Sequence, residues 1–493
     1  MKKIIPFITI ICLLLTSCQL KTPVTETYPV ETSSEYTAEH FGTTEYSEIL
    51  TETETQSYCV SYWLSTSRPL PQTTKPSTSK QSKATTKQYI PSTNRPLPQS
   101  TQAVPSTAKP VQSTAAQTTA QTTRPQQSVQ QEFRAIWISC YDHISAKGKT
   151  KAQYAAETDK MFANVKSYGF NTAFVHLRAF SDAFYKSDIY PYSAHIAGTE
   201  GADLPFDPFE VMLSSAAKYG ISVHGWINPF RVSTKKDTSL LSSKNPAKAL
   251  LGVEGRICVL DNGIYYNPSS TENHALIIDG VREILDKYSI DGIHIDDYFY
   301  PSTDKKVDSL QYGAYTSQGG TMSLSQWRTA NVNAFVSALY SAVKAKNSNL
   351  IFSISPSGKL EDNKTIHYAD CERWLSQRGY ADMIIPQIYY GFQHETLDFE
   401  KVLKQWASLP RDPSVKLVCG IASYKCGTED KYAGKGKTEW KTNSDILARQ
   451  TVSIRNNSAY CGLAMFSYSD LTKQTCAKEM QNYKQTINTG NSQ

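Results

Sequence analysis

An apolar, strand-like run followed by a segment of helical spacing recurs eight times between residues 132 and 493, and this repeat constrains the fold more than any other feature. The runs lie at 133–140, 171–178, 222–230, 291–299, 351–358, 383–390, 415–424 and 461–468. Eight strand-helix units predict a parallel (β/α)8 TIM barrel of the α/β class. A doubly wound open sheet is the alternative, but it usually has fewer strands, and no phosphate-binding glycine fingerprint follows the first run.

Helical spacing occurs between the strand-like runs and after the last one. The expected helices cover 151–168, 207–219, 272–289, 324–346, 367–379, 396–408, 443–456 and 474–486. Long insertions at 179–206, 231–271 and 300–323 follow the second, third and fourth strands. The loops that follow barrel strands lie on the face that carries active sites, so we expect these insertions to wall a groove for an extended substrate.

The composition divides the 493 residues into a tether and a folded part. Length alone suggests about three domains of roughly 150 residues. Residues 19–131, however, are rich in Ser, Thr, Gln and Pro, and repeat Arg-Pro-Leu-Pro-Gln at 68–72 and 95–99. Such a segment cannot bury enough apolar surface to offset its ordering entropy, so a disordered tether is predicted over 18–131. Residues 132–493 then form one large domain.

The N-terminus predicts the compartment. Lys2 and Lys3 precede an apolar run from Ile4 to Leu15, which is too short to cross a bilayer core of ~30 Å as a helix. We interpret residues 1–17 as a cleaved secretion signal. The run ends in Leu-Thr-Ser-Cys at 15–18, which resembles the bacterial lipobox, and this resemblance implies that Cys18 is lipid-modified. An ordinary signal peptide with a chance cysteine is the alternative.

Charge and cysteine content exclude some functions. The net charge is +6, of which Lys2 and Lys3 supply two and residues 19–131 a net one, so about +3 remains for the domain. A balance this small gives no argument for nucleic acid. The domain's seven cysteines show no metal-ligand spacing, so we expect no metal or other cofactor, and most of them to be buried thiols. The sequence alone does not exclude one disulfide among them.

Alternation along each strand predicts which side chains point into the barrel. In 291–299, Ile293 and Ile295 share one face, which places His294 and Asp296 on the inner face. An unsatisfied buried polar group costs about 1–3 kcal/mol, so a converging polar set indicates a polar ligand site. The same parity places further side chains inside: His176, Arg178, His224, Trp226, Asn228, Ser353, Ser355, Gln387 and Tyr389. Any single histidine could equally be a satisfied residue of the barrel interior.

Asp296 is the best candidate for a catalytic carboxylate, because it ends a strand and precedes Asp297 and the aromatic run Tyr298-Phe299-Tyr300. Adjacent carboxylates can divide acid and base roles when one pKa is raised. Since neighbouring strand residues point to opposite faces, we expect Asp297 to lie nearer the rim than the scissile bond. Glycoside hydrolysis needs a second carboxylate about 5–10 Å away. The candidates are Asp297, Asp182, Asp142 and Asp470.

At these positions the chain resembles the bacterial glycosyl-hydrolase-like family 10. The resemblance covers about 131–440 and includes HLRAFSDAFYKSDIYPYS at 176–193, HGWINPFRV at 224–232, DGIHIDDYFYP at 291–301 and PQIYYG at 386–391. It implies a TIM-barrel glycosidase outside the membrane, acting on peptidoglycan strands, with Asp296 and Asp297 at the site. Arg178, Asn228, Gln387 and Tyr389 also occupy its motif positions.

The run at 291–298 is also similar to the D-G-x-D-x-D-x-E strand of family 18 chitinases. Asp291, Gly292 and Asp296 match, but His294 replaces an aspartate and Tyr298 stands where the chitinases carry their acid glutamate. A substrate-assisted reaction on an N-acetyl sugar would therefore need another proton donor.

These observations favour a lipid-anchored hydrolase of envelope glycan on the outer face of a bacterial membrane. Asp296 is its principal carboxylate and Asp297 or Asp182 the partner; Tyr298 and the inward polar set bind the sugar. We expect a monomer whose partners are a glycan polymer and the membrane. A non-catalytic glycan-binding lipoprotein is the second hypothesis. An amidase or esterase is disfavoured, because no G-x-S-x-G elbow occurs.

Overall fold

The computed structural model describes residues 131–489. Eight parallel strands form a closed barrel in the order β1-β11-β10-β9-β8-β7-β3-β2, which confirms the predicted (β/α)8 class. Every predicted strand is present, although several are shorter than their apolar runs. The barrel strands are β1 Phe133–Ile138, β2 Thr172–Arg178, β3 Ser222–Ile227, β7 Gly292–Ile295, β8 Ile351–Ile354, β9 Met383–Ile384, β10 Lys416–Ala422 and β11 Tyr460–Phe466.

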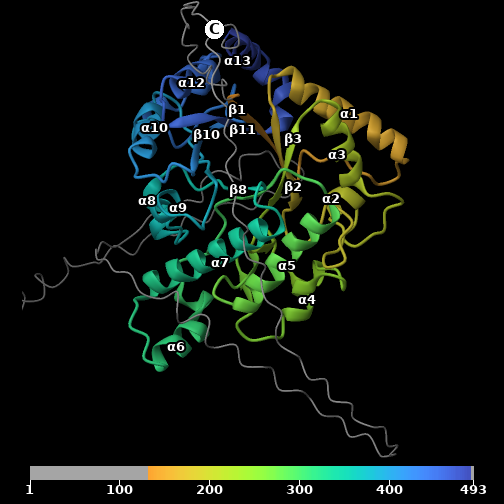
Figure 1. The fold of residues 1–493 in the computed structure, drawn as a ribbon, viewed down its shortest axis with the longest axis vertical. Helices are drawn as coiled ribbons and strands as arrows, with labels where there is room; N and C mark the ends of the chain where they lie inside the picture. Colours follow the sequence, from red (N-terminus) through yellow and green to blue (C-terminus); the bar gives the residue numbers. More distant parts are fainter. Residues whose placement is uncertain (1–130, 490–493) are drawn as a thin grey trace, which may run out of the picture. The chain divides into compact units, whose positions relative to one another are not determined.

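The predicted helices surround this barrel (Figure 1). Two of them begin at capping boxes, in which Thr150 and Ser323 each accept a backbone N–H three residues on and a glutamine side chain reciprocates. The helices that follow the barrel strands are α1 Lys151–Ser167, α3 Pro208–Lys218, α5 Thr271–Lys287, α7 Leu324–Lys346, α9 Cys371–Ser376, α10 Phe399–Ala407, α12 Ile446–Arg455 and α13 Ala477–Thr489.

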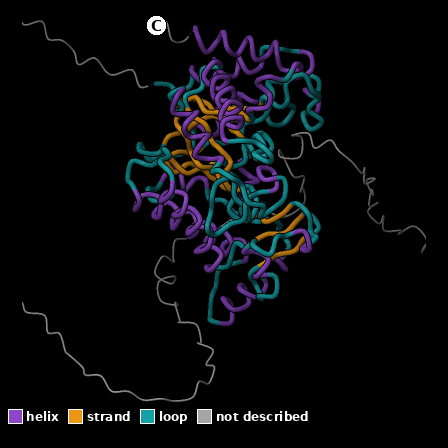
Figure 2. The backbone as a smooth tube through the Cα atoms, turned by 90° about the vertical axis from the view of Figure 1, so that its right-hand side faces the viewer, coloured by secondary structure: helices purple, strands orange, loops and turns teal. Residues whose placement is uncertain are grey.

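The insertions contain short elements that the repeat does not predict. After β3, strands β4 Arg231–Ser233, β5 Ile257–Leu260 and β6 Gly263–Tyr266 form an antiparallel sheet, which Figure 2 shows as a group of strands separate from the barrel. Its strands are only three or four residues long and are therefore difficult to detect by periodicity. The insertions also contain the short helices α2 Ala194–Ala197, α4 Pro246–Leu250 and α6 Ser309–Ser317. Two further short helices, α8 Leu360–Thr365 and α11 Glu439–Thr442, follow β8 and β10.

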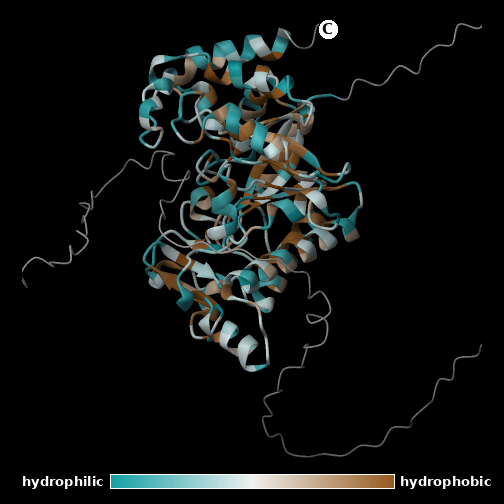
Figure 3. Ribbon diagram, turned by 90° about the vertical axis from the view of Figure 1, so that its left-hand side faces the viewer, coloured by the Kyte–Doolittle hydropathy of each residue, from teal (hydrophilic) through white to brown (hydrophobic). Residues whose placement is uncertain are grey.

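The core has two layers. Ile293 and Ile295 pack outward in the large layer between strands and helices, as alternation predicts. A smaller cluster, which includes Trp137, Phe174 and Trp226, fills the barrel interior. Figure 3 shows the resulting hydropathy pattern, with apolar strands inside a shell of helices that carry hydrophilic residues. The interior is thus a packed core rather than a channel.

His294 lies at the centre of this interior and joins three strands. Trp137 Nε1 of β1 donates to its Nε2 at 3.0 Å, and its Nδ1 lies 2.9 Å from Ser353 Oγ of β8. Because an indole N–H can only donate, Nε2 must accept, and the proton is on Nδ1. Burial, and then the neighbouring His224, hold the pKa of His294 well below its ordinary value. The ring is therefore a neutral structural link.

Three negative findings apply to residues 131–489. No helix among them is long and apolar enough to cross a membrane. Their seven cysteines are free thiols, and six of these are buried. No group of three or more His, Cys, Asp or Glu side chains in this range is arranged to hold a metal ion. The leader, Cys18 and the tether lie outside the described residues.

Barrel closure between β1 and β11 depends on Gly462, which faces Phe133 with φ +152°. A Cβ at this position would lie 1.9 Å from the Phe133 carbonyl oxygen. We therefore predict that Gly462→Ala lowers the free energy of unfolding by about 1–3 kcal/mol in chemical denaturation of the full chain. Gly313→Ala, with nothing within 4 Å, is the matched control and should not destabilise. Equal stability of the two variants would contradict this role for Gly462.

Candidate active site

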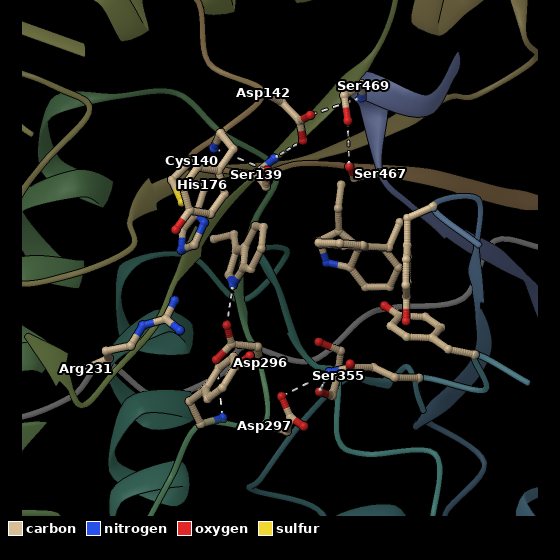
Figure 4. Close-up of a pocket in the computed structure, with 18 of the residues that line it drawn as sticks. Ser139, Cys140, Asp142, His176, Arg231, Asp296, Asp297, Ser355, Ser467 and Ser469 are labelled. Carbon is tan, nitrogen blue, oxygen red and sulfur yellow. Dashed lines mark hydrogen bonds between the residues drawn. The ribbon is translucent and has the colours of Figure 1, made fainter. Parts of the chain in front are cut away.

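A cavity of about 310 Å³ opens where the carboxyl ends of the barrel strands meet (Figure 4). Nine of the residues that the sequence suggested for the site line it: Asp142, His176, Trp226, Asp296, Asp297, Tyr298, Ser355, Gln387 and Tyr389. They come from β2, β3 and the segments that follow β1, β7, β8 and β9. The barrel topology therefore gathers distant parts of the chain at one place.

Asp296 is buried at the end of β7. Trp226 Nε1 donates to its Oδ2 at 3.1 Å, and the Tyr298 backbone N–H donates to its Oδ1 at 3.4 Å. Burial, and next the negative charge of Asp297, raise the pKa of Asp296 to about 7, although the positive charge of Arg231 opposes this rise. Near neutral pH this carboxyl group therefore exchanges a proton readily, as a general acid must.

Asp297 lies beside Asp296 and is half-buried. Gln387 Nε2 donates to its Oδ1 at 3.1 Å and also to the Ser355 carbonyl oxygen at 2.9 Å, which fixes the amide and orients the carboxylate. Strand alternation does not describe the direction of Asp297, because β7 ends at Ile295. Both carboxylates line the same cavity.

Arg231 supplies positive charge to the cavity wall, and strand alternation did not identify it. It begins β4, and its guanidinium carbon lies 4.6 Å from the centre of the Tyr298 ring and 4.9 Å from that of Phe180. Burial opposes its charge, but the neighbouring Tyr298 and Asp296 outweigh this effect and raise the pKa of Arg231. The signal that could have identified Arg231 is its place in the motif at 224–232.

His176 stacks on Trp226, with ring centres 3.6 Å apart and an interplanar angle of 11°. Burial, and then the charge of Arg231, hold the pKa of His176 well below its ordinary value, so the imidazole is neutral. Neither of its ring nitrogens has a hydrogen-bond partner among the described residues. His176 can therefore offer one donor and one acceptor to a ligand in the cavity.

Five side chains of the predicted inward set lie outside the cavity lining: Arg178, His224, Asn228, His294 and Ser353. His294 and His224 are deeper in the barrel, where His224 packs against Phe174. At Arg178 the pairing of β2 with β3 shifts by one residue, so strand parity no longer describes its direction. Its Nη1 donates to the carbonyl oxygens of Asn228 at 2.7 Å and Pro229 at 3.1 Å.

Arg178 and Asn228 instead hold the corner between β3 and β4. The Asn228 side-chain oxygen accepts the Arg231 backbone N–H at 3.2 Å. Arg178 lies over the Tyr190 ring, 4.8 Å from its centre. The corner therefore sets where Arg231 enters the cavity, and these two residues act as positioning residues in this structure.

The other candidate carboxylates differ in where they lie relative to the cavity and in their hydrogen-bond partners. Asp182 does not line the cavity; it accepts the Phe180 backbone N–H at 3.3 Å, and burial raises its pKa to about 6. Asp142 does line it, but its two oxygens accept backbone N–H groups of the loops after β1 and β11. Asp470 is buried and pairs with Lys473 Nζ at 2.7 Å. Asp297 is therefore the best placed partner for Asp296.

Loops after β1, β10 and β11 complete the cavity wall with residues that strand alternation did not select. Loop residues have no fixed parity, which explains their omission. They include Tyr141, Tyr424, Ser467, Ser469 and Lys473. The Phe466–Ser467 peptide in this wall is cis.

A closed parallel barrel with two adjacent carboxylates and aromatic walls at its carboxyl mouth defines a TIM-barrel protein of the glycoside-hydrolase-like type. The chain belongs to the glycosyl hydrolase-like 10 family, whose sequence pattern matches residues 132–435.

Two curated relatives carry hydrolase names. The chain is 29% identical over 364 residues to glycosyl hydrolase YngK of Bacillus subtilis (strain 168), covering 69% of each chain. It is 27% identical over 362 residues to glycosyl hydrolase DigH of Escherichia coli (strain K12), covering 67% of this chain and 79% of that protein. Among solved structures, the PgaB (BpsB) glycoside hydrolase domain from Bordetella bronchiseptica aligns with a TM-score of 0.49 and 13% identity, over 72% of this chain and 98% of that one.

The raised pKa of Asp296 predicts a pH-dependent stability difference. Between its ordinary pKa of 3.8 and about 7, the folded state keeps a proton that the unfolded state has released, so this contribution to stability is lost as pH rises through that window. Asp296→Asn removes the dependence. In chemical denaturation, the variant should therefore gain stability relative to the wild type as pH rises through the same window.

Asp261→Asn is the control for this comparison. Asp261 is exposed, and its hydrogen bond to Lys236 lowers its pKa below the ordinary value of 3.8. Its effect on stability should therefore not vary above about pH 4. If the Asp296→Asn difference were equally flat, the proposed protonation of Asp296 would be wrong.

Proposed function

We propose that this protein is an extracytoplasmic, lipid-anchored glycoside hydrolase that cleaves envelope glycan, specifically peptidoglycan strands, through Asp296 and Asp297. The observation that carries the proposal is the adjacency of two carboxylates in one cavity, where burial and Asp297 raise the pKa of Asp296 to about 7. Family membership and the names of the curated relatives support the reaction class.

In the proposed reaction, protonated Asp296 gives its proton to the glycosidic oxygen as the bond from that oxygen to the anomeric carbon breaks. The ionised Asp297 stabilises the positive charge that develops on the sugar ring. Water then supplies the hydroxyl group at the anomeric carbon, and its remaining proton restores Asp296. The net change is the addition of one water across the bond.

Neighbouring residues favour this division of roles. Gln387 Nε2 donates to Asp297 Oδ1, which holds this side chain in place in the cavity. The Asp296 carboxyl accepts the Trp226 indole N–H at 3.1 Å and is more deeply buried than Asp297. Tyrosines and Trp226 supply the flat apolar faces on which sugar rings pack.

The substrate and location follow from the leader and tether. The lipobox-like end at Cys18 supports an anchor on the outer membrane face, and the Pro-containing tether can extend the domain toward a cell wall. Peptidoglycan strands are the cell-wall glycan that a domain on such a tether would meet.

Asp296→Asn should lower the rate of release of reducing ends from purified peptide-free glycan strands by at least about 100-fold, because it removes the general acid. The kcat/KM of the wild type should fall as pH rises through about 7, since only protonated Asp296 can donate. Asp297→Asn should also abolish turnover, whereas Asp182→Asn should not, because Asp182 does not line the cavity.

Unchanged hydrolysis by Asp296→Asn would remove this residue from the mechanism. Binding of strands by the wild type without any release of reducing ends, even over long incubation, would instead favour the non-catalytic glycan-binding lipoprotein.

The anchor has a separate test. When the full chain is expressed in a bacterium supplied with radiolabelled fatty acid, the wild type should carry the label and sediment with membranes. Cys18→Ser should lose both properties, since the thiol at the lipobox position is removed, while Cys59→Ser, in the tether, should keep them. Unlabelled wild-type protein in the soluble fraction would refute the anchor.

A further inference from the structure

A second cavity, which we call the outer groove, continues the catalytic cavity outward. It has a volume of about 510 Å³, and seven residues line both spaces, among them Asp297, Tyr298 and Gln387. A ligand held at Asp297 is therefore already at the inner end of the outer groove. The outer groove is also lined by residues of the segment 424–432, which follows β10. Of this segment, only Tyr424 lines the catalytic cavity as well.

The exposed aromatic side chains of the domain gather in this groove. Among residues 131–489, Tyr141 and Tyr432 are the two Phe, Tyr or Trp side chains in the exposed class, at 44% and 57% exposure. Both line the outer groove. Tyr141 also lines the catalytic cavity, whereas Tyr432 does not. Exposure of an aromatic ring to water is unfavourable, so the presence of both exposed rings in one groove points to a ligand that covers them.

The loop that carries Tyr432 is held in place. Lys425 Nζ pairs with Asp430 Oδ2 at 2.6 Å, and this ion pair is largely buried. Asp430 Oδ1 also accepts the Tyr432 backbone N–H at 3.3 Å, and the Ala433 carbonyl oxygen accepts the Glu395 backbone N–H at 3.1 Å. The exposure of the Tyr432 ring is therefore a property of an ordered backbone, and binding a ligand there requires little further ordering.

The charges of the groove indicate the kind of ligand. Its lining side chains include four carboxylates and three Lys or Arg groups, so no single sign dominates. A polyanion such as nucleic acid would meet as much repulsion as attraction. A groove lined by several tyrosines and by side chains of both charges instead suits a sugar chain. Its sugar rings stack on aromatic faces, and its hydroxyl groups accept and donate hydrogen bonds.

We propose that the outer groove binds the continuation of the same glycan chain that is cleaved at Asp296, with Tyr432 stacking on a sugar ring several residues from the scissile bond. This inference rests on the proposed function. It adds that the enzyme recognises several consecutive sugar residues, because the outer groove continues from the carboxylates and can hold the polymer while the bond is broken.

The test compares Tyr432→Ala with the wild type on two substrates. One is peptide-free glycan strands; the other is an aryl glycoside of a single N-acetylated sugar, which occupies the catalytic cavity alone. Loss of one stacking contact should raise KM for the strands roughly fivefold to tenfold. Neither kcat nor KM should change for the aryl glycoside. Tyr432→Phe keeps the ring and should behave as the wild type.

Leu240→Ala is the matched control, because Leu240 in η2 Thr238–Leu240 is also 57% exposed but lines neither cavity. It should leave both substrates unaffected. Equal effects of Tyr432→Ala on both substrates, or no effect on either, would overturn the outer-groove inference while hydrolysis by the wild type still supported the proposed function. Hydrolysis of neither substrate by the wild type would overturn the proposed function and this inference together.

Discussion

The hydrogen bonds around His294 are the interaction on which the arrangement of the mouth depends. This ring sits in the middle of the barrel and joins β7 to β1 through Trp137 and to β8 through Ser353. Ser355 Oγ approaches the same Nε2 at 3.1 Å. Breaking such a buried set would leave unsatisfied groups at about 1–3 kcal/mol each. His294 thereby fixes the strand register two residues before Asp296.

Burial and neighbouring charges then determine the pKa of Asp296 at the carboxyl end of the barrel. Asp296 is placed against Trp226, which is itself held flat by stacking on His176. The neighbouring negative charge of Asp297 makes a second ionisation unfavourable, and Arg231 limits how far the pKa of Asp296 rises. The balance of desolvation and two opposite charges thus gives Asp296 a pKa of about 7.

Much of this architecture could be predicted because it follows strand periodicity. The eight strands, their helices and the outward packing of Ile293 and Ile295 all follow from apolar spacing. Prediction failed where periodicity ends. The register shift at Arg178 redirects its side chain to the β3–β4 corner, and the early end of β7 lets Asp297 face the cavity. Arg231 and Tyr432 lie on insertions and loops, whose direction depends on tertiary contacts.

The central claim is that the buried Asp296 beside Asp297 holds a proton near neutral pH. Neutron diffraction from deuterium-exchanged crystals, at a pD below the pKa of about 7, would locate that proton directly. The account predicts nuclear density for a deuteron on a carboxyl oxygen of Asp296. An Asp296 carboxyl group without a deuteron would contradict it.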